Sequence, residues 1–170
     1  MSDALPEPRD DDDQKLLDDV AQVGWHLVLV PEDADTPGWA YTIGLERSHG
    51  HPELVVFGLD LETAGGVLNL LGERIRDGER FALDAEIADV IEDGELALRP
   101  VAARWYEPFL GYARWFYGGD GFTAWQLFWP EDDGVMPWDE GASEWLRENQ
   151  PRLYATRVGE AGVEALLASM

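Results

Sequence analysis

Two neighbouring stretches decide the fold: Pro37-Gly-Trp-Ala-Tyr-Thr-Ile-Gly-Leu45 and Gly50-His-Pro-Glu-Leu-Val-Val-Phe-Gly-Leu59. Each contains a short apolar run of the kind that forms a buried strand, and each is bounded by turn-forming residues. Four polar side chains that could take part in binding or catalysis lie close together in these stretches: Tyr41, Thr42, His51 and Glu53. The pattern predicts either a functional site or a tightly built corner of a sheet.

Further strands are expected on both sides of this pair. The six strand-like runs cover residues 25–30, 39–45, 53–58, 81–87, 96–103 and 123–129. The first three follow one another without an intervening helix, which favours antiparallel pairing. Asp93-Gly94 is a strong hairpin turn between the fourth and fifth runs. A polar loop is expected at residues 46–51.

Helices are predicted where apolar residues recur every three or four positions. The clearest example runs from Leu61 to Asp77, with Asp60 as its N-terminal cap and Gly78 as its stop. A short amphipathic helix should run from Asp13 to Val23, and an aromatic one from Tyr106 to Tyr117. Weaker helical patterns occur around residue 145 and at 159–169.

These elements predict one α+β domain, built on a mainly antiparallel sheet or partly open barrel of about six strands with two to four packing helices. A chain of 170 residues fits a single domain with a real core. Residues 1–12 have the composition of a disordered acidic tail. Residues 13–142 form the α+β domain, and residues 143–170 form a helical C-terminal extension packed on the same domain.

The charge of the chain limits its partners. Thirty-five acidic residues against twelve basic ones give a net charge of −23, which repels nucleic acids and anionic membranes. We therefore expect no nucleic-acid or membrane binding, and either acidity that serves only solubility or a basic protein partner. With no cysteine, no signal peptide and no transmembrane run, the expected location is the cytoplasm. The chain is expected to be a monomer or a homodimer.

His51 and Glu53 form a pair that is competent in acid-base chemistry, and they would be the catalytic residues if the protein were an enzyme. Because Pro52 favours extended backbone before it, their side chains are expected on the same side of the strand. With His49 they offer the donor types of a metal site, although the spacing is cramped. A purely structural role, with both groups hydrogen bonded in the fold, explains the pair equally.

A second polar group lies near the end of the last strand, where Gln126, Trp129 and Trp138 combine amide and aromatic surfaces. Polar groups among aromatics are what a small-molecule pocket needs, yet large aromatics chiefly build cores. The expected ligand-binding set is Tyr41, Thr42, His51, Glu53, Gln126, Trp129 and Trp138. No P-loop, dinucleotide fingerprint or nucleophile elbow occurs, so we expect no cofactor.

The chain resembles an uncharacterised bacterial family, catalogued as domain of unknown function 4262. The resemblance rests on 40–45, 50–54, 57–59, 68–69, 99–101, 126–130 and 136–138, read as AYTIGL, GHPEL, FGL, LN, RPV, QLFWP and MPW. It implies a small intracellular α+β domain and brings no activity or catalytic assignment. Glu131 departs from the aspartate expected after Trp129-Pro130, which puts an aspartate-specific role there in doubt.

Three functions follow as hypotheses. The first is a non-catalytic binding or interaction module with a strongly acidic surface. The second is an enzyme or cofactor binder with a pocket between the Tyr41–Glu53 and Gln126–Trp138 motifs. The third is an inhibitor or immunity protein that covers a basic partner.

Overall fold

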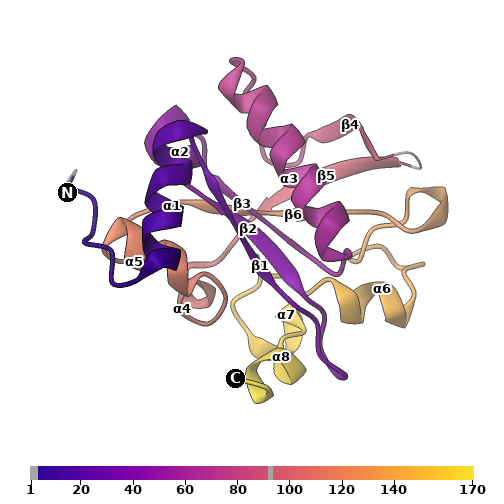
Figure 1. Ribbon diagram of the computed structural model, residues 1–170. Coiled ribbons are helices and arrows are strands. Elements are labelled where there is room, and N and C mark those ends of the chain that lie inside the picture. Colours follow the sequence, from indigo (N-terminus) through magenta and orange to yellow (C-terminus); the bar gives the residue numbers. More distant parts are fainter. Residues whose placement is uncertain (1–3, 92–93) are drawn as a thin grey trace.

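The sheet organises the whole molecule (Figure 1). The computed structural model describes residues 4–91 and 94–170. Its six strands are β1 (His26–Val30), β2 (Trp39–Ile43), β3 (Glu53–Phe57), β4 (Glu86–Ile91), β5 (Gly94–Pro100) and β6 (Ala124–Phe128). They lie in the order β1-β2-β3-β6-β5-β4, and only the β3–β6 pair is parallel. The prediction of a mainly antiparallel α+β sheet is confirmed, and the sheet is open.

Helices cover both faces of this sheet. The α-helices are α1 (Asp11–Gln22), α2 (Leu45–His49), α3 (Leu61–Arg76), α4 (Tyr106–Phe109), α5 (Gly111–Tyr117), α6 (Glu144–Asn149), α7 (Val158–Ala161) and α8 (Glu164–Ala168). Two short 3-10 turns, η1 (Ala103–Trp105) and η2 (Asp132–Gly134), follow β5 and β6. Six of the eight α-helices described have seven residues or fewer, so short helical turns add to the two to four packing helices expected.

The strands separate two hydrophobic clusters because successive side chains point to opposite faces. Along β3, Val55 and Phe57 join one cluster, with residues of α1, α4, α5 and the C-terminal helices. Leu54 and Val56 join the other, which is built mainly on α3. Figure 1 shows α3 on one side of the sheet and α1, α4 and α5 on the other. The central strand is therefore covered on both faces.

The predicted helix 106–117 is interrupted at Leu110, where φ and ψ are −126° and 35°. Tertiary hydrogen bonds explain the break. The indole N–H of Trp39 donates to the carbonyl of Phe109 (3.0 Å), and the hydroxyl of Tyr41 accepts from the backbone N–H of Tyr112 (3.3 Å). Both backbone groups would bond within an unbroken helix. Contacts with β2 thus replace two helical bonds.

Other element boundaries also differ from the prediction. Helix α1 begins at Asp11, two residues early, because the Asp10 side chain accepts a bond from the Asp13 N–H. The expected loop at 46–51 contains α2. Strand β4 begins only at Glu86, after a turn in which Asp84 has a φ of 62°. Strands β4 and β5 pair as a hairpin, although Asp93 of its predicted turn lies outside the described residues.

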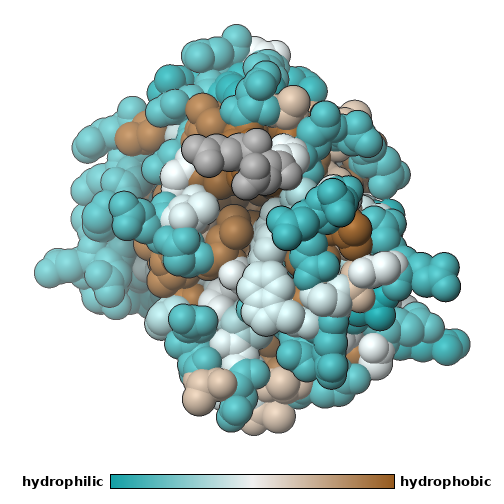
Figure 2. Space-filling view, turned by 90° about the vertical axis from the view of Figure 1, so that its right-hand side faces the viewer, coloured by the Kyte–Doolittle hydropathy of each residue, from teal (hydrophilic) through white to brown (hydrophobic). Residues whose placement is uncertain are grey.

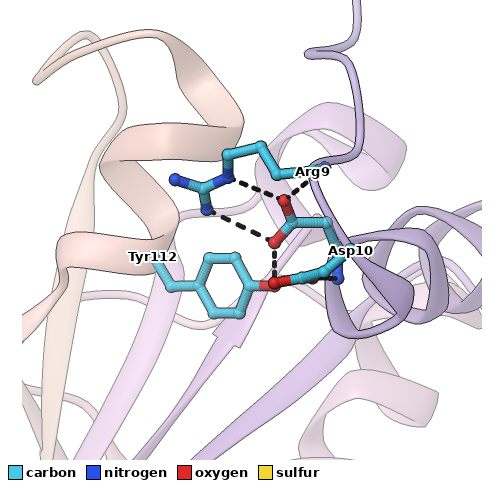
Figure 3. A network of polar contacts seen from close by, with 4 residues as sticks. Arg9, Asp10 and Tyr112 are labelled. Atoms are coloured by element: carbon cyan, nitrogen blue, oxygen red, sulfur yellow. Dashed lines mark hydrogen bonds and ion pairs between the residues drawn. The ribbon is translucent and has the colours of Figure 1, made fainter.

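A polar contact fastens α1 to α5 (Figure 3). The carboxylate of Asp13 is buried and accepts bonds from the Arg9 guanidinium (2.8 Å), the Arg9 backbone N–H (2.8 Å) and the Tyr112 hydroxyl. The hydrogen bonds from Arg9 hold the pKa of Asp13 well below its usual range. An aspartate in the acidic N-terminal run thus anchors a helix.

The C-terminal segment packs on the domain through buried residues. Leu146 of α6 belongs to the α3 cluster, whereas Leu153, Ala161 and Leu166 join the opposite one. Gly162, with a φ of 70°, separates α7 from α8 where one weak helix was predicted. None of the helices in the described ranges is long and apolar enough to cross a membrane.

Candidate functional site

Glu53 lies at the start of β3 with its carboxylate buried inside the fold. One oxygen accepts from the Thr42 hydroxyl (2.8 Å) and from the backbone N–H of Leu45 (3.1 Å). The other accepts from the backbone N–H groups of Gly44 (2.9 Å) and Glu46 (3.4 Å) and from the Tyr117 hydroxyl. Five donors therefore surround the carboxyl group, and they join β2, α2 and α5 at one point.

Burial dominates the ionisation of Glu53. It raises the pKa of this carboxyl to about 7, although the hydrogen bonds from Tyr117, Gly44 and Thr42 act in the opposite direction. Burial raises the pKa of Tyr117 well above its usual value, and the neighbouring Glu53 carboxylate raises it further. With 2% of its surface exposed, Glu53 is placed as an internal brace and does not face solvent.

His51 is equally buried but makes separate contacts. Its Nδ1 lies 2.8 Å from the carbonyl of Pro52, so Nδ1 carries the proton and donates. Its Nε2 then accepts from the backbone N–H of Phe81 (3.4 Å). Burial lowers the pKa of His51, and the charge of Arg80 lowers it further against the opposing Pro52 bond. This imidazole is neutral with both nitrogens occupied.

The two predicted catalytic side chains point to opposite faces of the sheet, contrary to the expectation that they share one. The ring of His51 packs on Phe81 and Trp125, which belong to the α3 side. Glu53 reaches Tyr117, which packs on the other cluster. Pro52 lies between them outside the strand, so strict alternation along β3 does not extend to His51.

His49, the third residue of the weak metal hypothesis, lies apart from both. Its ring packs edge-on against Trp25 at 6.5 Å and against Gly24, and its Nε2 is buried without a hydrogen bond. Within the described ranges, no group of three or more His, Cys, Asp or Glu side chains is arranged to hold a metal ion.

The two sequence motifs adjoin because β3 and β6 pair directly, with Val55 opposite Gln126. The Gln126 amide is fully buried, donating to the carbonyl of Pro151 (2.6 Å) and accepting from the N–H of Leu153 (3.0 Å). The indole N–H of Trp129 donates to the carbonyl of Phe57 (2.8 Å). These polar groups bind backbone inside the protein.

Trp138 is the most accessible of the predicted ligand-binding residues. The Arg99 guanidinium carbon lies 3.6 Å from the centre of its indole ring and 4.8 Å from that of Tyr154. Trp138 also packs edge-on against Phe128 at 4.9 Å. The indole face is thus occupied by a cation of the same chain.

Two of the surface hollows among the described residues adjoin each other. One, which we call the Trp145 groove, has a volume of about 770 Å³. It is lined by Leu59, Ile91, Trp129, Pro130, Glu131, Asp132, Asp133, Val135, Gly141 and Trp145. Figure 2 views this side of the molecule, where apolar surface shows within hollows among hydrophilic residues. Trp129 of this lining belongs to the expected ligand-binding set, whereas Trp145 and the acidic turn at 131–133 were not predicted to form a site.

The second hollow, of about 680 Å³, lies beside the groove and shares Asp133 with it. Together the described residues lining the two hollows include one basic side chain, Arg99, and seven acidic ones. These seven, the acidic face, are Asp84, Glu86, Glu95, Glu131, Asp132, Asp133 and Asp139. A hydrogen bond with Glu86, and its charge, raise the pKa of Glu95. The carboxylates of the acidic face therefore outnumber the basic side chains that line the same two hollows.

The geometry defines an open-sheet α+β domain whose predicted reactive side chains are internal and which carries two adjoining acidic hollows on its surface. Residues 19–143 match the family described as a domain of unknown function, DUF4262, and the chain belongs to this family. Neither the curated proteins nor the solved structures gave a significant match. The second hollow and most of the groove fall within the matched residues, whereas Trp145 lies just beyond them.

Proposed function

We propose that this chain is a non-catalytic binding module whose acidic face docks on the basic surface of a protein partner. The observation that carries the proposal is the charge of the two adjoining hollows, with seven carboxylates to one guanidinium. Complementary charge steers association and selects partners, and it suits a chain of net charge −23. A narrower form of the same function is an inhibitor with one basic target.

The internal contacts of the predicted pocket residues support binding over catalysis. A general base needs a free lone pair within reach of a substrate. Both nitrogens of His51 and both oxygens of Glu53 are instead engaged within the chain. Gln126 likewise fastens the segment after α6 to β6.

Site-specific photocrosslinking tests the proposal. A photoreactive residue is placed at Glu95 in the producing cells, the captured protein is purified, and its affinity is measured at several salt concentrations. Changing Glu86, Glu95 and Asp132 to their amides should weaken binding about tenfold, since each exposed charge pair contributes about 0.5 kcal/mol. The salt dependence should also become shallower.

The control changes the same number of charges elsewhere. Glu62, Glu73 and Glu107 are exposed residues of α3 and α4, outside the acidic face. Converting these three to glutamine should leave the affinity within about twofold of the wild type. Equal loss in both triple variants would show that only net charge matters, and the acidic face would then not be the docking surface.

A further inference from the structure

We propose that the Trp145 groove receives one apolar side chain from a short basic segment of the partner, with arginine or lysine residues beside it. This inference rests on the proposed function and gives the partner segment a definite chemistry. The groove supplies an apolar floor, an exposed aromatic ring and a carboxylate rim, and each of these selects a different part of that segment.

The floor of the groove is rigid. The indole N–H of Trp129 is fixed to the carbonyl of Phe57 at 2.8 Å. The Gln150 side chain also brackets this residue, accepting from its backbone N–H (3.0 Å) and donating to its carbonyl (2.8 Å). A preformed wall loses little conformational freedom when a ligand contacts it, so binding energy is retained. Leu59, Ile91 and Val135 complete the apolar lining.

Trp145 makes the groove a candidate for an anchor contact. It packs edge-on against Trp129 at 5.7 Å, yet 57% of its surface is exposed. A tryptophan half covered by a rigid wall leaves one ring face for a partner, and tryptophans dominate binding energy at protein interfaces. The groove volume of about 770 Å³ is large enough for a branched or aromatic side chain.

The rim selects positive charge. Glu131 accepts bonds from the N–H and hydroxyl of Ser143, which hold it against the start of α6. No ion pair within the described ranges engages Asp132 or Asp133. No basic side chain lines the groove within those ranges, so an arginine or lysine of the partner meets uncompensated carboxylates.

Synthetic peptides test the inference without knowledge of the partner. The probe is a fluorescently labelled, end-capped octapeptide with four arginines around one central leucine, in a serine and glycine background. A second peptide replaces the leucine with serine, and a third replaces each arginine with uncharged citrulline. Binding is measured by fluorescence anisotropy at low salt, and 5-fluorotryptophan ¹⁹F NMR reports whether the Trp145 resonance moves.

The wild type should bind the leucine peptide about tenfold more tightly than the serine peptide, because burying the leucine removes apolar surface from water. Trp145→Ala should abolish this preference, and the milder Trp145→Phe should retain part of it. Leu29→Ala removes an apolar residue that is 47% exposed from β1, on an edge of the sheet outside the groove, and should leave the preference unchanged. The citrulline peptide should not bind measurably.

Two outcomes would overturn the inference, and they differ in what they say about the proposed function. If leucine and serine peptides bind the wild type equally, the groove takes no apolar anchor, while the acidic face still stands as a docking surface. If neither arginine peptide binds at low salt, both the anchor and the basic partner are wrong. Thermal unfolding of each variant establishes that the comparison is made between folded proteins.

Discussion

Replacing Glu53 by glutamine tests the reading of this residue as an internal brace. The carboxyl group meets five donors, three of them backbone N–H groups of Gly44, Leu45 and Glu46. An amide nitrogen cannot accept a hydrogen bond, so whichever oxygen it replaces, at least one buried N–H loses its partner. An orphaned buried donor costs about 1 to 3 kcal/mol, and contact between two N–H groups adds to this.

The size of the effect should depend on pH. Because the pKa of Glu53 is raised from an ordinary 4.5 to about 7, the folded state keeps a proton that the unfolded chain releases. Wild-type stability should therefore fall as pH rises from about 4.5 to about 7, by about 3 kcal/mol in total. Glutamine does not titrate. Glu53→Gln should be less stable than wild type by about 2 to 3 kcal/mol at pH 5, and the gap should close by pH 8.

Urea unfolding at pH 5, 6, 7 and 8, followed by tryptophan fluorescence, measures this gap. Glu148→Gln, an exposed change on α6, corrects for the general effect of removing one negative charge. A gap that widens with pH would mean that the five hydrogen bonds outweigh burial and depress the pKa, refuting the assignment of burial as the dominant cause. A gap below about 0.5 kcal/mol at pH 5 would contradict the brace itself.

Two further changes test neighbouring features. Tyr117→Phe removes a donor that lowers the pKa of Glu53, so the stability of this variant should level off at a higher pH than that of the wild type in the same urea series; an unchanged profile would contradict the contact. Gly72→Ala should lower the melting temperature by about 3 to 8 °C, because its Cβ would come within 2.7 Å of the Trp25 ring. Gly66→Ala in the same helix meets nothing within 4 Å and should raise it slightly, so a matching fall in both would disprove the packing argument.

Local signals in the sequence were enough to locate most of the strands and the longest helix. The run Glu53–Phe57 is apolar after its first residue because β3 is covered on both faces. Helix α3 begins after the Asp60 cap and ends at Arg76, one residue before the predicted end at Asp77. These features depend on hydrophobic spacing and capping, which neighbouring residues alone specify. The break at Leu110 could not be read in this way, since its causes are Trp39 and Tyr41, about seventy residues away.

The candidate site shows the same division. The sequence identified Glu53, His51 and Gln126 as unusual polar residues among apolar ones, and the structure explains each as buried and hydrogen bonded. Whether such a polar side chain faces a cavity or a backbone amide depends on which distant segments of the chain pack against it. The Trp145 groove, by contrast, gathers residues from 59 to 145. No local pattern connects them.

The opening stretches by themselves determined two buried strands and a polar corner between them. Composition determined the strong negative charge. Only the tertiary structure decided that Glu53 and His51 point to opposite faces and that acidic and aromatic residues meet on one surface. The physical reason is that burial and hydrogen bonding assign each polar side chain its role, and both are set by contacts between distant segments.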